Sequence, residues 1–255
     1  MADIQEHRTD LRHRFEQAMG YWDPACDDVL SVAPAYFAAY TDYLIASQKT
    51  GALSPKVREF IHITLNASTT HLHAPALRLH IANALRLGAT AAEIMEVFQI
   101  ISILGVHGVM LAMPILAEEA GAMGQPVDVA DLSPRQQAMK ARYVSGRGFW
   151  PPGWDEIVAL APDYFDAHEK LGAVPREHGV IGPKEREFIL IAVDTACTHL
   201  FPDGIRNHTR AALRHGASVA EITEVITLTS ILGLHSVTFG VPILMQELAK
   251  LNRAA

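Results

Sequence analysis

Glutamates and histidines recur in this chain as matched pairs whose residue numbers differ by 128. A carboxylate beside an imidazole is the arrangement that general acid–base catalysis needs, because the carboxylate orients the ring and the ring moves the proton. We therefore treat polar residues that occur in both copies as the first functional candidates. The pairs of greatest chemical interest are Glu59/Glu187, His71/His199, His80/His208 and His107/His235.

Glu59 lies in an otherwise apolar helical stretch, and His80 lies in the next predicted helix. Burying a carboxylate is costly unless it is paired or protonated. A short loop joins the two helices, so they must pack antiparallel, which can bring Glu59 within hydrogen-bond distance of His80. The same spacing applies to Glu187 and His208. The alternative interpretation of Glu59 is an ion pair with a nearby arginine.

The other two histidine pairs allow a structural or a functional interpretation. His71 and His199 end a predicted helix, where an imidazole also suits the helix dipole. His107 and His235 each follow an apolar helix and a glycine, where they could cap backbone carbonyls or contact a ligand.

Shared histidines and a shared glutamate could also bind a divalent metal ion, because zinc, iron and manganese accept imidazole and carboxylate ligands. No HxxxH or HExxH motif is present. His62 and His73 rank lower as candidates, since the second copy has Leu190 and Phe201 at these positions.

The paired residues belong to an internal repeat without gaps. Pro55–Phe60 matches Pro183–Phe188, and Ser102–His107 matches Ser230–His235. We predict two similar units, residues 1–125 and residues 126–255, joined by a linker at 120–132 that contains two glycines and a proline.

Apolar residues recur with the period of an α-helix, and strand-like alternation is nearly absent, which predicts an all-α fold. Ser54-Pro55 is a typical helix start, and Thr90-Ala-Ala-Glu93 and Ser218-Val-Ala-Glu221 are typical capping boxes. We expect one stripe of the helix that begins at Thr90 to carry Glu96, Ile100, Ile103 and His107. The expected helices of the first unit cover about 27–47, 55–70, 76–87, a third from Thr90, and a fourth that contains Pro114 and ends near Glu119.

Composition narrows the functional classes. The chain has 255 residues, a formal net charge of −7 and no basic cluster that would favour nucleic acid. Its two cysteines form no CxxC motif, and its polar N-terminus has no apolar signal core, so we expect a cytoplasmic protein. The apolar stretch Ile100–Leu116 is interpreted as two buried helices, interrupted near Gly105 and Pro114, rather than a membrane span.

The same motifs follow one another along each unit. The first copy has Arg58-Glu59-Phe60-Ile61, Leu77-Arg78-Leu79-His80 and Gly88-Ala89-Thr90 before Glu93-Ile94; the second has Arg186-Glu187-Phe188-Ile189, Ile205-Arg206-Asn207-His208 and Gly216-Ala217-Ser218 before Glu221-Ile222. This order resembles the carboxymuconolactone decarboxylase family, which belongs to a superfamily with the alkylhydroperoxidase D-like proteins. The segment where those peroxidases carry CxxC reads Thr70–Ala74 and Thr198–Pro202, which argues against peroxidase activity.

The resemblance implies a fold of two tandem helical repeats packed as a pseudo-dimer, and a homotrimer with pseudo-hexameric symmetry. It implies a cofactor-free decarboxylase acting on a small carboxylated lactone or a related ring-cleavage acid, with no metal, nucleic-acid or membrane partner. A metal-dependent enzyme and a non-catalytic, ring-forming small-molecule binding protein remain the alternatives. The implied acids are His80 and His208, oriented by Glu59 and Glu187, and the implied substrate contacts are His71, Arg78, His107, His199, Arg206 and His235.

Overall fold

The computed structural model describes residues 2–254 and contains no β-strand within that range, so the predicted all-α fold is confirmed. The first repeat consists of α1 (Ala2–Met19), α2 (Cys26–Val32), α3 (Pro34–Ser47), α4 (Pro55–Ala67), α5 (Ala74–Arg86), α6 (Ala91–Ser102), the 3-10 helix η1 (Ile103–Gly105) and α7 (Val106–Ala122). The second repeat has the same order in α8 (Pro134–Arg147), α9 (Trp154–Leu160), α10 (Pro162–Glu177), α11 (Pro183–Thr195), α12 (Pro202–Arg214), α13 (Val219–Leu228), η2 (Thr229–Leu234) and α14 (His235–Ala254).

The helix starts follow the capping signals of the sequence. The Ser54 side chain accepts the N–H of Val57 at the start of α4. Thr90 forms a reciprocal capping box with Glu93 at the start of α6, and Ser218 does the same at α13. Each cap satisfies backbone groups that a helix end otherwise leaves unpaired.

Three expectations about the helices are wrong. The segment at 27–47 is not one helix, because the chain breaks at Ala33, before Pro34, where the proline ring disfavours helical geometry for the preceding residue. His107 does not lie on the helix of Glu96, since η1 intervenes and His107 belongs to the first turn of α7. This helix also continues through Pro114 instead of breaking there.

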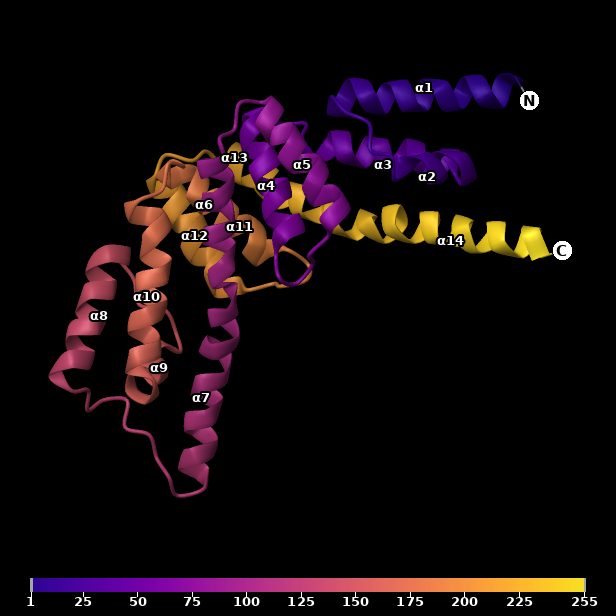
Figure 1. Cartoon of the computed structure of the whole chain (residues 1–255). Helices are drawn as coiled ribbons and strands as arrows, with labels where there is room; N and C mark the ends of the chain where they lie inside the picture. The colour runs from indigo at the N-terminus through magenta and orange to yellow at the C-terminus, as the bar shows by residue number, and fades with distance from the viewer. Residues whose placement is uncertain (1, 255) are drawn as a thin grey trace.

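The two repeats do not pack as separate bodies. One hydrophobic core contains Phe15 and Phe37 from the first repeat together with Phe188 and Leu228 from the second. Helices α1–α3 of the first repeat lie beside α14, and α8–α10 of the second lie beside α7, so each repeat completes a core in the other (Figure 1).

Glu96 and Glu224 connect the repeats. Glu96 accepts the backbone N–H groups of Val180 and Ile181 at 2.5 and 2.7 Å, and Glu224 accepts that of Ala52 at 2.8 Å. Each carboxylate thereby fixes the loop that precedes α11 or α4 in the other repeat. These two shared glutamates are therefore explained by structure.

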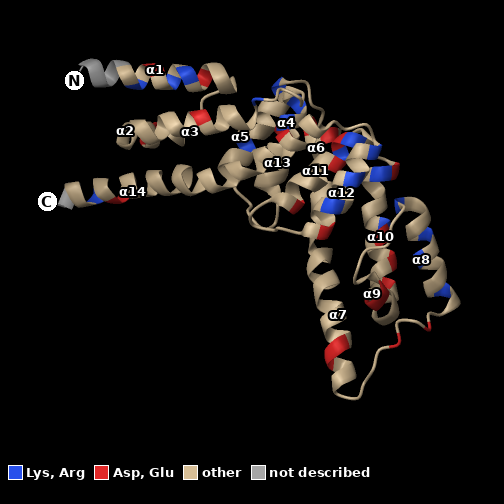
Figure 2. Ribbon diagram, turned by 180° about the vertical axis from the view of Figure 1, so that it is seen from behind, with Lys and Arg blue, Asp and Glu red and all other residues tan. Residues whose placement is uncertain are grey.

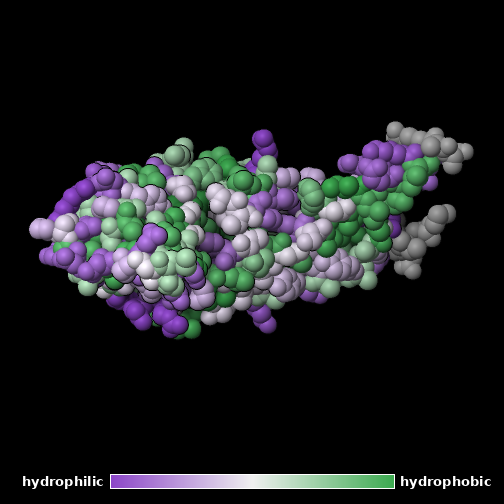
Figure 3. Space-filling model, turned by 90° about the horizontal axis from the view of Figure 1, so that it is seen from below, coloured by the Kyte–Doolittle hydropathy of each residue, from purple (hydrophilic) through white to green (hydrophobic). Residues whose placement is uncertain are grey.

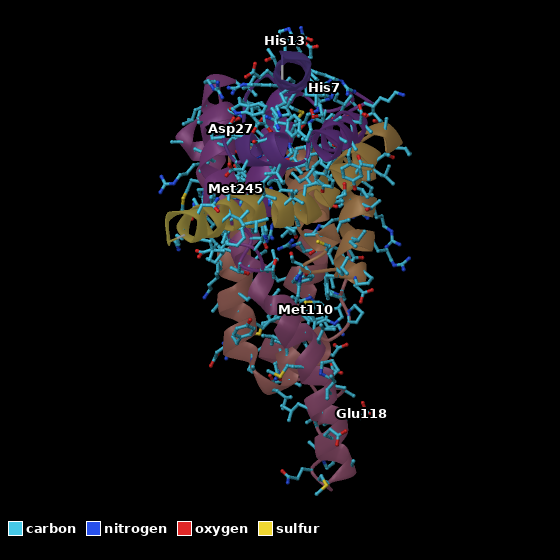
Figure 4. All side chains as sticks on the ribbon, turned by 90° about the vertical axis from the view of Figure 1, so that its right-hand side faces the viewer. His7, His13, Asp27, Met110, Glu118 and Met245 are labelled. Carbon is cyan, nitrogen blue, oxygen red and sulfur yellow. The ribbon has the colours of Figure 1, made fainter. Side chains whose placement is uncertain are left out.

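The long helices α7 and α14 project from the body with large exposed apolar side chains. Leu111 of α7 is 62% exposed and Phe239 of α14 is 60% exposed. Figure 2 shows both helices with few charged residues, and Figure 3 shows hydrophobic surface near the end that carries the termini. In Figure 4, Met110 lies where α7 runs beside the second repeat, whereas Glu118 lies near its protruding end.

By length and composition alone, two continuous helical stretches, Ala91–Ala122 and Val219–Asn252, are apolar enough to cross a membrane. In the most apolar window of each stretch, 28% and 33% of the residues are buried in the single chain. The expectation of burial holds for the inner part of 100–116, where Ile100, Leu104 and Met110 are buried, and not for the outer part of α7, which extends beyond its neighbours.

Candidate active site

Each repeat contains a hydrogen-bonded glutamate–histidine pair, as the spacing predicts. Nδ1 of His80 lies 2.8 Å from Oε2 of Glu59, and Nδ1 of His208 lies 2.7 Å from Oε2 of Glu187. In each pair, α4 or α11 carries the glutamate and the antiparallel α5 or α12 carries the histidine. The bond to Nδ1 leaves Nε2 of each ring free for another partner.

The loops between these helices share an uncommon backbone geometry. Leu72 and Leu200 have φ values of 48° and 52°, in the left-handed region that side chains other than glycine rarely adopt. Each leucine directly follows a shared histidine, His71 or His199. The strained turn sets the direction in which that histidine leaves the loop.

A cavity of about 320 Å³ lies beside the second pair. Glu187 and His208 line it together with Phe201 and with His107, which the first repeat contributes. Three arginines also line the cavity: Arg147, Arg176 and Arg186. Guanidinium groups bind carboxylates well through paired hydrogen bonds, so the arginine side of the cavity suits an acidic ligand.

The matching region of the first repeat is divided into two spaces. An inner space of about 30 Å³ touches His80 but not Glu59, and an outer space of about 410 Å³ touches Glu59 but not His80. Met19, Tyr21 and His62 line both spaces and form the wall between them. Neither of these two spaces touches both members of the first pair.

Larger side chains fill the inner space of the first repeat. Tyr40 stands where the second repeat has His168, and Leu44 stands where it has Gly172. All four residues line the matching spaces of their own repeat. The two sites therefore differ through α3 and α10, although their Glu–His pairs are alike.

The charge of the two sites differs as well. Met19 and Gln48 replace Arg147 and Arg176, so two of the three cavity arginines occur only in the second repeat. Burial and the nearby charge of Arg147 lower the pKa of Arg176. Burial and both arginines lower the pKa of His168 to about 4. The lining of the cavity therefore has three arginines against two carboxylates, Glu187 and Asp203.

The histidine of the first pair is enclosed. The ring of His80 stacks on that of His62, with 4.2 Å between the centroids. Burial lowers the pKa of His80 to about 3 and raises the pKa of Glu59. At neutral pH the His80 ring is uncharged and has no extra proton to deliver.

The remaining shared histidines pair across the repeats. Nε2 of His71 lies 2.8 Å from Nδ1 of His235, and Nδ1 of His107 lies 2.7 Å from Nε2 of His199. The Phe201 ring stacks on His107 at a centroid distance of 3.9 Å and holds its orientation. His107 and His235 each sit in the first turn of a helix, so the expected role as caps of a preceding helix end is not what the structure shows.

Asp194 is a further buried group beside the cavity. Its carboxylate is fully buried and has no hydrogen-bond partner among the described residues. Burial raises the pKa of Asp194 to about 7, and Nε2 of His208 lies 3.9 Å from Oδ2 of Asp194. The first repeat has Asn66 at this position.

Arg78 and Arg206, expected to hold the substrate, do not line the cavity. Both are exposed, and Arg206 lines a shallow depression with Pro202 and Ile205 on the outer side of α12. Each arginine lies two residues before its histidine, which is about 200° around the helix and places it on the side away from the Glu–His pair.

Sequence reasoning missed Arg147, Arg176, His168 and Asp194. None of these residues occurs at the matching position of the first repeat, so a search for shared residues excluded them. A signal was present in Asp194, an acidic residue that follows the apolar run Ile189–Val193.

Comparisons with known proteins agree with this architecture. The profile of the carboxymuconolactone decarboxylase family matches residues 34–118 and 162–236. The chain is similar to the crystal structure of a candidate gamma-carboxymuconolactone decarboxylase subunit from Burkholderia xenovorans LB400, with a TM-score of 0.90 and 33% sequence identity over 97% of this chain and 98% of that one. No curated protein matches the chain.

Proposed function

Because the chain belongs to the carboxymuconolactone decarboxylase family, we propose that it is a carboxy-lyase with its active site in the second repeat. Its substrate is a small carboxylated lactone or a related ring-cleavage acid. The observation that carries this proposal is the continuous cavity in which the Glu187–His208 pair and three arginines face one space.

The arginines bind the acidic groups of the substrate. Arg147 and Arg176 approach from α8 and α10, and Arg186 lies on α11 one residue before Glu187. This arrangement fixes the reacting carbon relative to His208, because bidentate ion pairs restrict both position and orientation.

Catalysis transfers one proton to carbon. The bond between the ring carbon and its carboxylate breaks, carbon dioxide leaves, and the electron pair moves into the conjugated lactone carbonyl. His208 then delivers a proton from Nε2 to the carbon that retains the charge. Glu187 accepts the Nδ1–H of His208 and keeps the ring aimed at the cavity.

The first repeat supports the fold rather than the reaction. Its Glu59–His80 pair keeps the same hydrogen bond, but no cavity reaches both members, and the pKa of His80 is too low for an acid at neutral pH. This assignment narrows the sequence-based prediction of two catalytic pairs to one.

The proposal is tested by release of carbon dioxide from a panel of carboxylated lactones and ring-cleavage acids, measured with purified full-length protein. Turnover of at least one carboxylated lactone is expected, and the corresponding lactone without a carboxylate should not bind. Absence of turnover across the panel, with tight binding of the same acids, would favour the non-catalytic binding protein instead.

We also propose a cytoplasmic homotrimer. Helices α7 and α14 expose large apolar side chains, and contiguous apolar surface of this kind is typical of protein–protein contacts. This surface supports contacts between copies of the chain. His107 and His235 lie at the inner ends of these two helices, so assembly would also stabilise both sites.

A further inference from the structure

Asp194 is not used by the proton transfer described above, although it lies directly behind Gly204 and His208, which line the cavity. Neither of its oxygens accepts a hydrogen bond, and the side chain is completely buried. A buried carboxylate without a donor or a cation is costly, and such groups in proteins are paired or bind metal ions.

Two neutral ring nitrogens face this carboxylate at equal distances. Oδ1 of Asp194 lies 3.7 Å from Nδ1 of His107 and 3.7 Å from Nε2 of His199, and these nitrogens lie 2.7 Å apart. Both distances to the carboxylate are too long for hydrogen bonds. The hydrogen bond between the two rings therefore leaves the buried Asp194 carboxylate without a donor or a cation.

The dimensions of this triangle fit a metal ion. The point in the plane of these three atoms that is equidistant from corners separated by 2.7, 3.7 and 3.7 Å lies about 2.0 Å from each, which is the length of a zinc–nitrogen or zinc–oxygen bond. A tetrahedral ion with bonds of this length spaces its ligand atoms about 3.3 Å apart, so the two imidazole nitrogens would separate by about 0.6 Å when the ion binds. Two imidazoles and one carboxylate are also a donor set that suits divalent first-row metals.

We propose that His107, Asp194 and His199 bind one divalent transition-metal ion, such as Zn²⁺, at the junction of the two repeats. His107 comes from α7 of the first repeat, and the other two ligands come from α11 and the loop after it. A tetrahedral ion held by three protein ligands keeps a fourth position for water or a substrate oxygen. Of the three ligands His107 lines the cavity, which places the proposed ion next to the cavity wall.

The first repeat supports this assignment, because it loses one metal-type ligand and gains another relative to the second repeat. It has Asn66 where the second has Asp194, which removes one ligand, and it has His73 where the second has Phe201, which adds one. His71, His73 and His235 accordingly form a second cluster whose ligand atoms lie within 4.8 Å of one another. Three metal-type ligands are thus retained in each copy, although the third comes from a different position.

The test is metal binding by the full-length protein, stripped with a chelator and titrated with Zn²⁺ by calorimetry and with Co²⁺ by visible absorption. Wild-type protein is expected to bind both ions, and the Co²⁺-loaded protein should show the intense visible absorption bands of tetrahedral coordination. Asp194→Asn, which installs the residue of the first repeat, should weaken this binding by more than about 100-fold, because a direct ligand is lost.

His73→Phe is the matched control, since it installs the residue of the second repeat and removes a ligand only from the other cluster. It should leave the Asp194-dependent ion in place. Thermal unfolding of both metal-free variants shows whether they are folded, and His199→Gln provides a second loss of a ligand if Asp194→Asn does not fold.

The proposal is overturned if stripped wild-type protein binds neither ion at micromolar concentration. It is also overturned if His73→Phe abolishes all binding or if Asp194→Asn and His199→Gln bind as wild type does. These readouts need no turnover, so they stand apart from the test of the proposed reaction.

Discussion

His80 and His208 show how one residue pair acquires two environments. Each histidine forms a hydrogen bond with the glutamate of its own repeat, and the sequence predicted both of these bonds correctly. Their surroundings come from helices about 40 residues away in the chain, where Tyr40 and His168 differ. The motif therefore predicts the pair but not its access to substrate.

The cavity arginines could not be found by comparing the repeats, because the comparison favours what the copies share. Arg147 and Arg176 are specific to the second copy, whereas the shared Arg78 and Arg206 lie on the exposed side of their helices. Residues retained in both copies here include many that hold the repeats together, such as Glu96 and Glu224.

Removing the cavity charge should weaken substrate binding more than it slows chemistry. Arg147→Met and Arg176→Gln install the residues of the first repeat, Met19 and Gln48. Each change is expected to raise KM by about tenfold or more, because a charged hydrogen bond to a carboxylate contributes about 1.5–3 kcal/mol. Steady-state kinetics on a carboxylated lactone measures this, and an unchanged KM in the double variant would contradict the assigned binding site.

The buried histidines predict a loss of stability in acid. Burial lowers the pKa of His62 to about 3 from an ordinary value of 6.5. Between these values the unfolded chain binds a proton that the folded chain does not, so the free energy of unfolding falls as the pH decreases from 6.5 toward 3. The slope for one such group is at most about 1.4 kcal/mol per pH unit.

His62→Leu, which installs the residue of the second repeat, should therefore flatten this dependence. Urea unfolding between about pH 7 and pH 5 measures the slope in both proteins. Equal slopes for wild type and variant would show that His62 is not kept neutral by the fold.

At the scale of elements, capping and proline signals located the helix starts well, because these signals act within one turn. The interruption near Gly105 was predicted and is present as η1, but the expected break at Pro114 is absent, because the helical hydrogen-bond pattern of α7 accommodates the proline. The packing of the repeats against each other was expected, but which helices of one repeat cover the other was not, since similar apolar faces in the two copies fit either repeat.

The close approach of α12 to α11 should depend on Gly204. A Cβ atom at Gly204 would collide with the Asp194 carboxylate and lie 2.8 Å from the Phe201 ring. Gly204→Ala is therefore expected to destabilise the fold by about 1–3 kcal/mol through overpacking. Gly240→Ala is the control, because a Cβ there meets nothing within 4 Å.

Chemical denaturation of the two variants distinguishes this effect from general sensitivity to substitution. If Gly204→Ala unfolds at the same denaturant midpoint as wild type, α12 can shift outward without a loss of stability.

At the scale of the whole molecule, the predicted homotrimer gives the apolar faces of α7 and α14 a partner. Analytical ultracentrifugation should find the mass of three 27.9 kDa chains. Leu111→Glu combined with Phe239→Glu should dissociate the assembly, because a charge in a buried apolar contact is strongly unfavourable. Val219→Glu, at an exposed site on α13 outside both faces, is the control.

A wild-type monomer at all concentrations would contradict the proposed assembly. An unchanged mass for the double variant would instead place the contact on another surface.

The central claim is that one of two similar Glu–His pairs performs the reaction. The most direct measurement is kcat for decarboxylation by His208→Asn and His80→Asn, with both variants shown to be folded. We predict that His208→Asn lowers kcat by about 100-fold or more, as expected for loss of a general acid, and that His80→Asn changes it by less than about threefold. Equal losses in the two variants, or a larger loss in His80→Asn, would contradict the account.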